Sequence, residues 1–398
     1  MSEKLWQKGY ELDRFVEKFT VGKDYIVDVK LINYDIVASI VHAKMLSKMG
    51  YITHEEFKQI ESVLKELADL VKKGSFQIKQ EDEDCHTAIE NFLIQKLGDT
   101  GKKIHTARSR NDQILTALRL FYKDQLKEIQ ELTEKLIKAT ENFSKKYGKV
   151  SFAGFTHTRK AMPTDFHTWS MALHDALKDD LSILKMTYRL IDQSPLGTGA
   201  GYGIPILVDR EFIARELGFK KIQQNPIYTQ LSRGKFEYLI LHSLSQISYD
   251  LNRFASEIVF FSLPEIGYIV LPKELCTGSS IMPQKLNPDP LELVRAYHNR
   301  IVSKMIECVT IPSNLITGYH RDLQLLKETM IEGFQIVKDI IVVMQIVFEK
   351  LQVDENRCSK SLTDDVMATH KVYELVKQGV PFRDAYKKIA QKFGGDEK

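Results

Sequence analysis

The sequence is poor in the residues and patterns that mark specialised classes of protein. Only four of its 398 residues are cysteines, and no two form a CxxC pair, so neither a disulfide framework nor a zinc site is indicated. Its 56 basic and 53 acidic residues are interspersed, which leaves no basic surface for nucleic acid. No uncharged apolar run reaches the roughly 18 residues that a membrane span requires, and no signal-peptide core is present near the start. We therefore expect a cytoplasmic protein with reduced thiols and with neither nucleic-acid nor membrane partners.

Strand-like alternation is also rare, whereas helical periodicity is present almost throughout the chain. The fold class that this pattern predicts is all-α. Thr53 and Glu56 have the spacing of a capping box at the start of a helix that continues through Val71. Longer helical patterns cover residues 28–49, 108–147, 163–192, 235–261, 291–309 and 328–351, with Pro163 expected in the first turn of its helix.

These patterns divide the chain into three expected domains: an N-terminal helical domain over residues 1–107, a central bundle of long helices over 108–350, and a short C-terminal helical domain over 351–398. Several long helices carry apolar stripes that are difficult to cover within one chain. Residues 340–348, Ile-Ile-Val-Val-Met-Gln-Ile-Val-Phe, are apolar on nearly every side. A bundle shared between subunits would bury such faces, so we expect a homo-oligomer.

The stretch from residue 277 to 290 has the composition of a functional loop. It combines small residues, three prolines and several polar side chains between two expected helices. Gly278 permits unusual backbone angles beside Ser279, Lys285 supplies a positive charge, and Asn287 offers amide donors and acceptors. Together these groups are suited to stabilising an anion, although composition alone is also compatible with a solvated linker.

The amino-acid sequences of this loop and of two other segments resemble sequence motifs of known enzymes. Residues 278–288, Gly-Ser-Ser-Ile-Met-Pro-Gln-Lys-Leu-Asn-Pro, resemble the signature of the aspartase/fumarase superfamily. Residues 105–113, His-Thr-Ala-Arg-Ser-Arg-Asn-Asp-Gln, resemble the string His-Thr-Gly-Arg-Ser-Arg-Asn-Asp-Gln of the argininosuccinate lyase family, and residues 154–157, Gly-Phe-Thr-His, resemble its Gly-Tyr-Thr-His. The Ser-Arg-Asn-Asp-Gln part separates this family from fumarase, aspartase and adenylosuccinate lyase.

This resemblance implies a carbon–nitrogen lyase that cleaves argininosuccinate reversibly to arginine and fumarate, a step of arginine biosynthesis. It implies a homotetramer in which three subunits contribute to each active site, and it calls for no cofactor and no metal. By position in the motifs, Ser279 is the base that removes the proton and His157 is the general acid, oriented by Glu292. Lys285 would stabilise the negative charge that develops on the substrate carboxylate. The base and acid roles of Ser279 and His157 stay interchangeable at this point.

The same resemblance assigns substrate binding to Ser109, Arg110, Asn111, Thr156, Asn287, Tyr319, Gln324, Lys327, Asp84 and His86. Taken singly, such residues have simpler interpretations. His157 has the character of a satisfied core histidine, and Glu292 that of a first-turn residue complementing a helix dipole. Asp84 and His86, with Cys85 between them, form a weak metal-like cluster that has no further ligand at suitable spacing.

The chain departs from the family pattern at a few positions. Residues 156–163 read Thr-His-Thr-Arg-Lys-Ala-Met-Pro where the family has Thr-His-x-Gln-x-Ala-Gln-Pro, which puts the hydrogen bonding around His157 in question. Ala107 replaces a glycine, Leu286 replaces a lysine, and Asp24 aligns only loosely with a substrate-binding serine. The alternatives are another fumarate-releasing lyase, such as adenylosuccinate lyase, and a non-catalytic structural protein on the same scaffold, as in the delta-crystallins.

Overall fold

The computed structural model describes residues 13–393, which are predominantly helical, as the all-α prediction requires. Backbone packing divides the chain into two compact units. Unit 1 comprises Met1–Ile129, Ile183–Leu244 and Ile301–Gln335, and unit 2 comprises Gln130–Ser182, Ser245–Arg300 and Ile336–Lys398. Among the described residues, no helix combines the length and the apolar character needed to cross a membrane. The three-domain division expected from the sequence stays a prediction.

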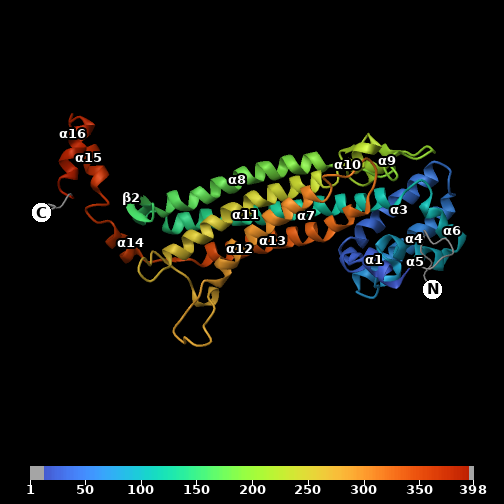
Figure 1. Ribbon diagram of the computed structural model, residues 1–398, viewed down its shortest axis with the longest axis horizontal. Coiled ribbons are helices and arrows are strands. Elements are labelled where there is room, and N and C mark those ends of the chain that lie inside the picture. The colour runs from blue at the N-terminus through green and yellow to red at the C-terminus, as the bar shows by residue number, and fades with distance from the viewer. Residues whose placement is uncertain (1–12, 394–398) are drawn as a thin grey trace. The chain divides into compact units, whose positions relative to one another are not determined.

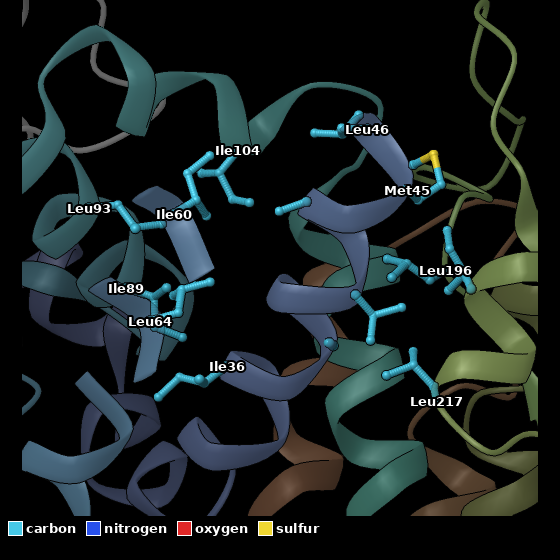
Figure 2. Close-up of a cluster of buried hydrophobic side chains, with 14 of the residues drawn as sticks. Ile36, Met45, Leu46, Ile60, Leu64, Ile89, Leu93, Ile104, Leu196 and Leu217 are labelled. Atoms are coloured by element: carbon cyan, nitrogen blue, oxygen red, sulfur yellow. The ribbon is translucent and has the colours of Figure 1, made fainter. Parts of the chain in front are cut away.

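Unit 1 contains eight shorter helices of the described residues, six from the N-terminal part of the chain and two from its middle. They are α1 (Arg14–Val21), α2 (Asp24–Val27), α3 (Ile32–Lys48), α4 (His54–Lys72), α5 (Cys85–Leu97), α6 (Asp99–Lys102), α9 (Arg210–Glu216) and α10 (Pro226–Leu231). Leucine, isoleucine and methionine side chains from α3, α4, α5 and the region around α9 fill one apolar core (Figure 2). Helix α4 begins with the expected capping box, in which Thr53 Oγ1 accepts from the Glu56 N–H at 3.1 Å and the Thr53 N–H donates to the Glu56 carboxylate at 2.8 Å.

Five long helices have residues in both units. They are α7 (Arg110–Tyr147), α8 (Phe166–Ile191), α11 (Lys235–Phe261), α12 (Asp289–Thr310) and α13 (Leu326–Lys350). The sequence pattern places α7, α11, α12 and α13 correctly to within two residues at each end, because each has an uninterrupted helical apolar stripe. Within unit 2 these helices lie side by side (Figure 1). Aromatic rings make contacts between them. Phe143 lies 5.8 Å from Trp169 and 5.8 Å from Phe348 between ring centroids, which joins α7, α8 and α13.

The placement of Pro163 in the first turn of α8 is wrong. Pro163 lies in β2 (Arg159–Asp165), which pairs antiparallel with β1 (Ser151–Thr156), and α8 begins only at Phe166. The ladder is irregular between Ala153 and Phe155, close to the residue that faces Pro163. A proline has no N–H to donate, so it is tolerated in a short hairpin beside such an irregularity. The hairpin was missed because its two strands show no regular alternation of polar and apolar residues.

The remaining strands are two residues long and join segments distant in sequence. Strands β3 (Gln193–Ser194) and β4 (Lys221–Ile222) pair in parallel in unit 1, whereas β5 (Ile269–Val270) and β6 (Gln352–Val353) pair antiparallel in unit 2. Three short helices follow β6: α14 (Glu355–Ser361), α15 (Ala368–Lys377) and α16 (Phe382–Ala390). Helices α15 and α16 pack on each other around Val372, Ala385 and Ile389.

A pair of carboxyl groups lies between α8 and α11 in unit 2. Asp180 is 4% exposed, its Oδ2 has no hydrogen-bond partner among the described residues, and its neighbour across the helix pair is Asp250. Burial, followed by the charges of Asp250 and Asp179, raises the pKa of Asp180 to about 7. The folded state therefore binds a proton that the unfolded state releases near pH 4, and this contribution to stability is lost as the pH rises toward 7.

We expect Asp180→Asn to raise the melting temperature at pH 8 and to change it little at pH 5. The amide reproduces the neutral carboxyl, which donates to Asp250, and it removes the cost of a buried negative charge at the higher pH. Thermal melting at the two pH values checks this, with Asp69→Asn as the control because Asp69 is an exposed aspartate of α4 that does not act on Asp180. A lower melting temperature for Asp180→Asn at pH 8 would show that the carboxylate is charged and paired there.

Candidate active site

The Ser-Arg-Asn-Asp segment forms the start of α7 in unit 1. The Ser109 hydroxyl accepts the N–H of Asn111 at 3.2 Å, and the Ser109 N–H donates to Asp112 at 2.8 Å. This reciprocal arrangement satisfies two backbone donors at the helix start. The N-terminus of a 38-residue helix is a favourable place for an anion, because its N–H groups and dipole both attract negative charge. Ser109 and Asn111 are thus placed to bind a carboxylate.

Asp112 fixes this helix start to the glycine-rich segment 197–203. Its buried carboxylate accepts the N–H groups of Gly197 and Gly199, each at 2.9 Å. The same segment continues to Gly201, where the backbone φ is +128° and an added Cβ would lie 3.0 Å from the Cα of Gly318. Only glycine permits this close approach. The segment thereby positions Tyr319, whose N–H donates to the Ala200 carbonyl at 3.3 Å.

Asp84 and Arg110 form an ion pair at the wall of the site. Asp84 caps the N-terminus of α5, accepting from the Thr87 N–H at 2.9 Å, and its other oxygen accepts from Arg110. Burial would raise the pKa of Asp84, but the charges of His86 and Arg110 outweigh burial and lower it to about 2. Arg110 also donates to Glu83 at 3.4 Å, and its side chain is 26% exposed. It therefore keeps a solvent-facing edge while its position is fixed.

His86 is held from behind by a buried carboxylate. Its Nδ1 lies 2.6 Å from Asp35 Oδ2, and Asp35 in turn accepts from the Gln113 side chain at 2.8 Å. Burial would lower the pKa of His86, but Asp35 outweighs burial and raises it, which favours the imidazolium. With Nδ1 occupied by Asp35, the opposite nitrogen Nε2 is buried and has no partner among the described residues. Nε2 is therefore available as a donor to a bound anion.

Lys327 joins α13 to the N-terminal segment. Its ammonium lies 2.7 Å from Asp28 and 2.8 Å from Asp24, and its side chain is 4% exposed. Burial would lower the pKa of Lys327, but the two carboxylates outweigh burial and raise it. Burial also raises the pKa of Asp24 to about 6, although the positive charge of Lys327 acts to lower it.

The metal-like cluster noted around Cys85 is better explained by this lysine. Asp28, Cys85 and His86 do bring potential ligand atoms within 4.8 Å of one another. The Lys327 ammonium already neutralises Asp28, however, and His86 directs Nδ1 to Asp35. Burial also raises the pKa of the Cys85 thiol well above its ordinary value, which disfavours the thiolate that a metal would need. These residues do not fit a metal site.

A cavity of about 370 Å³ in unit 1 brings most of these groups together. Of the residues assigned to substrate binding from the sequence, it is lined by Asp84, His86, Ser109, Arg110, Asn111, Tyr319, Gln324 and Lys327. The sequence assignment missed four charged residues that also line the cavity: Asp24, Glu83, Arg233 and Arg321. The cavity thus offers both positive and negative groups to a bound ligand.

The loop that contains Ser279 belongs to unit 2, where Figure 1 shows it extending away from the helices between α11 and α12. Backbone hydrogen bonds of 3.0 and 2.8 Å between Thr277 and Asn287 close its base. The Asn287 side chain donates to the Gly278 carbonyl at 3.3 Å. The Ser279 hydroxyl oxygen accepts N–H groups from Ile281 at 3.4 Å and Met282 at 3.1 Å. Donors pointing at this oxygen would stabilise it as an alkoxide.

His157 occupies the tip of the β1–β2 hairpin, also in unit 2. His157 and Thr158 have φ angles of 51° and 57°, the left-handed conformation of a two-residue hairpin turn. This conformation is costly for a β-branched residue such as Thr158 and is typical of functional sites. His157, the preceding Thr156, and Glu292 on α12 are all exposed, as is Lys285. Within residues 13–393, no hydrogen bond joins His157 to Glu292, so the predicted orientation of His157 stays a prediction.

Comparison with known proteins agrees with these motifs. A family model described as lyase matches residues 8–303. An argininosuccinate lyase of Thermotoga neapolitana is 67% identical over 397 residues, and the match covers 100% of both chains. The chain belongs to the argininosuccinate lyase family. A second member, from Bacteroides fragilis, is 37% identical over 389 residues, which are 98% of this chain and 87% of that protein.

Solved structures more distant in sequence share the fold of this family member. A variant of EDDS lyase with bound fumarate aligns with a TM-score of 0.81 at 22% identity, covering 96% of this chain and 76% of that chain. A class II fumarase from Schistosoma mansoni aligns with a TM-score of 0.79 at 15% identity, covering 96% and 93%. These two enzymes therefore share the all-helical fold of this chain.

The structure also explains one departure from the family string. Ala107 stands where the family has glycine, and its φ is 59°, in the left-handed region that favours glycine. The chain between His105 and the start of α7 therefore needs this conformation, and alanine adopts it at a modest cost.

Proposed function

We propose that this chain is an argininosuccinate lyase, which cleaves argininosuccinate by β-elimination to arginine and fumarate. The observation that carries the proposal is the cavity of unit 1, where the Ser-Arg-Asn segment at the N-terminus of α7 faces Tyr319, Gln324 and Lys327. Argininosuccinate carries three carboxylates, an ammonium and a guanidinium. A cavity with both fixed cations and fixed carboxylates matches that mixed charge, whereas a purely dicarboxylic substrate would not need Asp24 and Asp84.

The elimination removes a weakly acidic proton next to a carboxylate, so negative charge accumulates on that carboxylate in the transition state. In our proposal Ser279 takes the proton. The two N–H groups directed at its hydroxyl oxygen lower the cost of the alkoxide, and Lys285 and Asn287 from the same loop receive charge on the substrate carboxylate. His157, with Glu292 as its partner, would protonate the departing guanidino nitrogen.

The binding cavity and the acid–base residues lie in different compact units of the chain. We propose that they meet in a homotetramer, where one subunit supplies the cavity and others supply the Ser279 loop and the His157 hairpin. Exposed apolar side chains support self-association: Leu293 on α12 is 55% exposed, Ile306 on the same helix is 52% exposed, and Ile281 at the loop tip is 84% exposed. A second copy of the chain would cover them.

Native mass and turnover test this assembly together. We expect a tetramer in dilute buffer, with activity that decreases on dilution below the concentration where the tetramer dissociates. A monomer with full activity would contradict the composite site.

The reaction itself is tested by the choice of substrate. Purified protein should release fumarate, followed by its absorbance, from argininosuccinate and not from adenylosuccinate, aspartate or malate. Release from adenylosuccinate alone would favour the other lyase, and no release from any of them would favour a structural protein on the same scaffold. We place the enzyme in the cytoplasm, a compartment that suits four free cysteines.

A further inference from the structure

Arg233 is a buried arginine with unused hydrogen-bond donors. It lies between α10 and α11 in unit 1 and is 4% exposed. Its Nη2 donates to the Leu323 carbonyl at 3.2 Å. Its Nε and Nη1 are buried and have no partner among the described residues. Buried guanidinium donors are normally satisfied, so these free N–H groups call for an acceptor that the chain itself does not provide.

The charges around Arg233 are also unbalanced. Arg233 and Arg119 are both buried and near enough to repel each other, and the buried carboxylate of Glu237 attracts Arg119. That carboxylate is already engaged, because it accepts from the Tyr122 hydroxyl at 3.3 Å and from the Gly234 N–H at 2.7 Å. Among the described residues, the Arg233 guanidinium itself has no carboxylate partner. An excess buried positive charge is expensive unless an anion reaches it.

The two arginines differ in their access to the cavity. Arg119 donates to the carbonyls of Ile191 and Gln193, each at 3.1 Å, and its guanidinium lies 4.7 Å from the centroid of the Phe236 ring. These contacts enclose it. Arg233 lines the cavity, and its guanidinium lies 5.4 Å from the centroid of the Tyr319 ring, another lining residue. The excess charge therefore faces the cavity through Arg233.

We propose that Arg233 is a substrate-binding residue whose free N–H groups bind a carboxylate of the substrate beside the Tyr319 ring. The inference rests on the proposed function for the identity of the substrate, and it adds a residue that no sequence motif marks. The carboxylate has two sources in argininosuccinate: the α-carboxylate of the arginine part and the two carboxylates of the succinate part. A purely structural Arg233 would instead act only through its bond to Leu323, by fixing the turn before α13.

Arg233→Gln should raise the KM for argininosuccinate about 10- to 100-fold, the range for losing a hydrogen bond to a charged group, with a smaller change in kcat. Binding of the two products, L-arginine and fumarate, shows which part of argininosuccinate supplies the carboxylate that Arg233 binds. Product binding is measured by inhibition and by the shift in melting temperature. If the arginine part supplies it, the variant loses the wild-type preference for L-arginine over agmatine, which lacks the α-carboxylate. If the succinate part supplies it, fumarate binding weakens by the same factor and that preference stays.

Two further variants keep the test decisive. Arg233→Lys retains the positive charge but not the planar set of donors, and it should show the same loss of carboxylate binding if Arg233→Gln fails to fold. Arg215→Gln removes an exposed arginine elsewhere in unit 1 and should leave KM and product binding unchanged. A structural role alone would lower the melting temperature of both Arg233 variants while their affinities for L-arginine and fumarate stayed at the wild-type values.

Wild-type affinities for L-arginine and fumarate in both Arg233 variants would overturn the inference. Failure of the proposed function is a separate outcome, seen in the wild-type protein when argininosuccinate yields no fumarate. Even then, the melting-temperature shifts with L-arginine, agmatine and fumarate would show whether Arg233 binds carboxylates. If Arg233→Lys bound all three as the wild type does, the inference would be wrong.

Discussion

Ser279→Ala should lower kcat by at least about a hundredfold, the contribution expected of a general base, with little change in KM. Ser279 lies on a loop of unit 2, and the hydrogen bonds that its side chain makes are with the N–H groups of Ile281 and Met282. Losing the hydroxyl should therefore disturb no core packing. Substrate affinity should persist because it comes from the cavity of unit 1.

Ser280→Ala is the matched control, since Ser280 is the next residue of the same loop and is exposed. It should be much milder. Steady-state kinetics, thermal melting and native mass of the two variants separate a chemical loss from a folding loss. Near-normal turnover in Ser279→Ala, or a larger loss in Ser280→Ala, would remove Ser279 from the role of base and leave His157 as the stronger candidate.

Lys327→Met should cost about 3–5 kcal/mol of stability, the range for removing one partner of a buried ion pair, and should also abolish substrate binding. The lysine neutralises Asp28, which is fully buried, and Asp24. Without it two desolvated carboxylates face each other. The raised pKa of Lys327 means that its contribution is complete below the ordinary lysine value of 10.5 and is lost only as the pH rises through the higher folded value.

Denaturant unfolding at pH 7 measures the loss. Lys23→Met is the control, because it breaks the neighbouring Lys23–Glu328 pair, which is exposed, and should change stability little. Adding Asp28→Asn to Lys327→Met should recover part of the lost stability, because it removes one of the two carboxylates left without a counter-charge. If the single variant unfolded at the wild-type denaturant concentration, the ion pair would not hold the N-terminal segment to α13.

The sequence was sufficient to place α4, α7, α11, α12 and α13 because the signal for these helices is local. The stripe of α11 and the capping box at Thr53 depend on residues within a few turns of each other. The β1–β2 hairpin was not predicted, since its strands are held by pairing and by the Ser361 hydroxyl, which accepts the Ala153 N–H at 2.9 Å. A hydrogen bond between residues 208 positions apart cannot be predicted from a local sequence pattern.

Some residues of the candidate site could likewise be predicted from local sequence motifs, and others could not. Asp84, Arg110 and Lys327 were found because they lie in recognisable strings, and the structure gathers them in one cavity. Asp24 and Arg233 lie outside those strings, and their roles appear only when burial and hydrogen-bond partners are known. The loose alignment of Asp24 with a substrate-binding serine was the signal available in the sequence, and that alignment does not identify Lys327 as its partner.

We propose an assembly in which one copy of the chain binds the substrate in unit 1 while another copy supplies the acid–base residues from unit 2. It is tested by mixing two inactive variants, Asn111→Ala in the cavity and Ser279→Ala in the loop, and reassembling them as hybrid tetramers. If the two residues of each site come from different subunits, random assembly leaves both intact in about a quarter of the sites, so fumarate release should recover toward that fraction of the wild-type rate. If every site were built from a single chain, each would keep one of the two defects. Hybrids as inactive as the two parent variants would contradict the account.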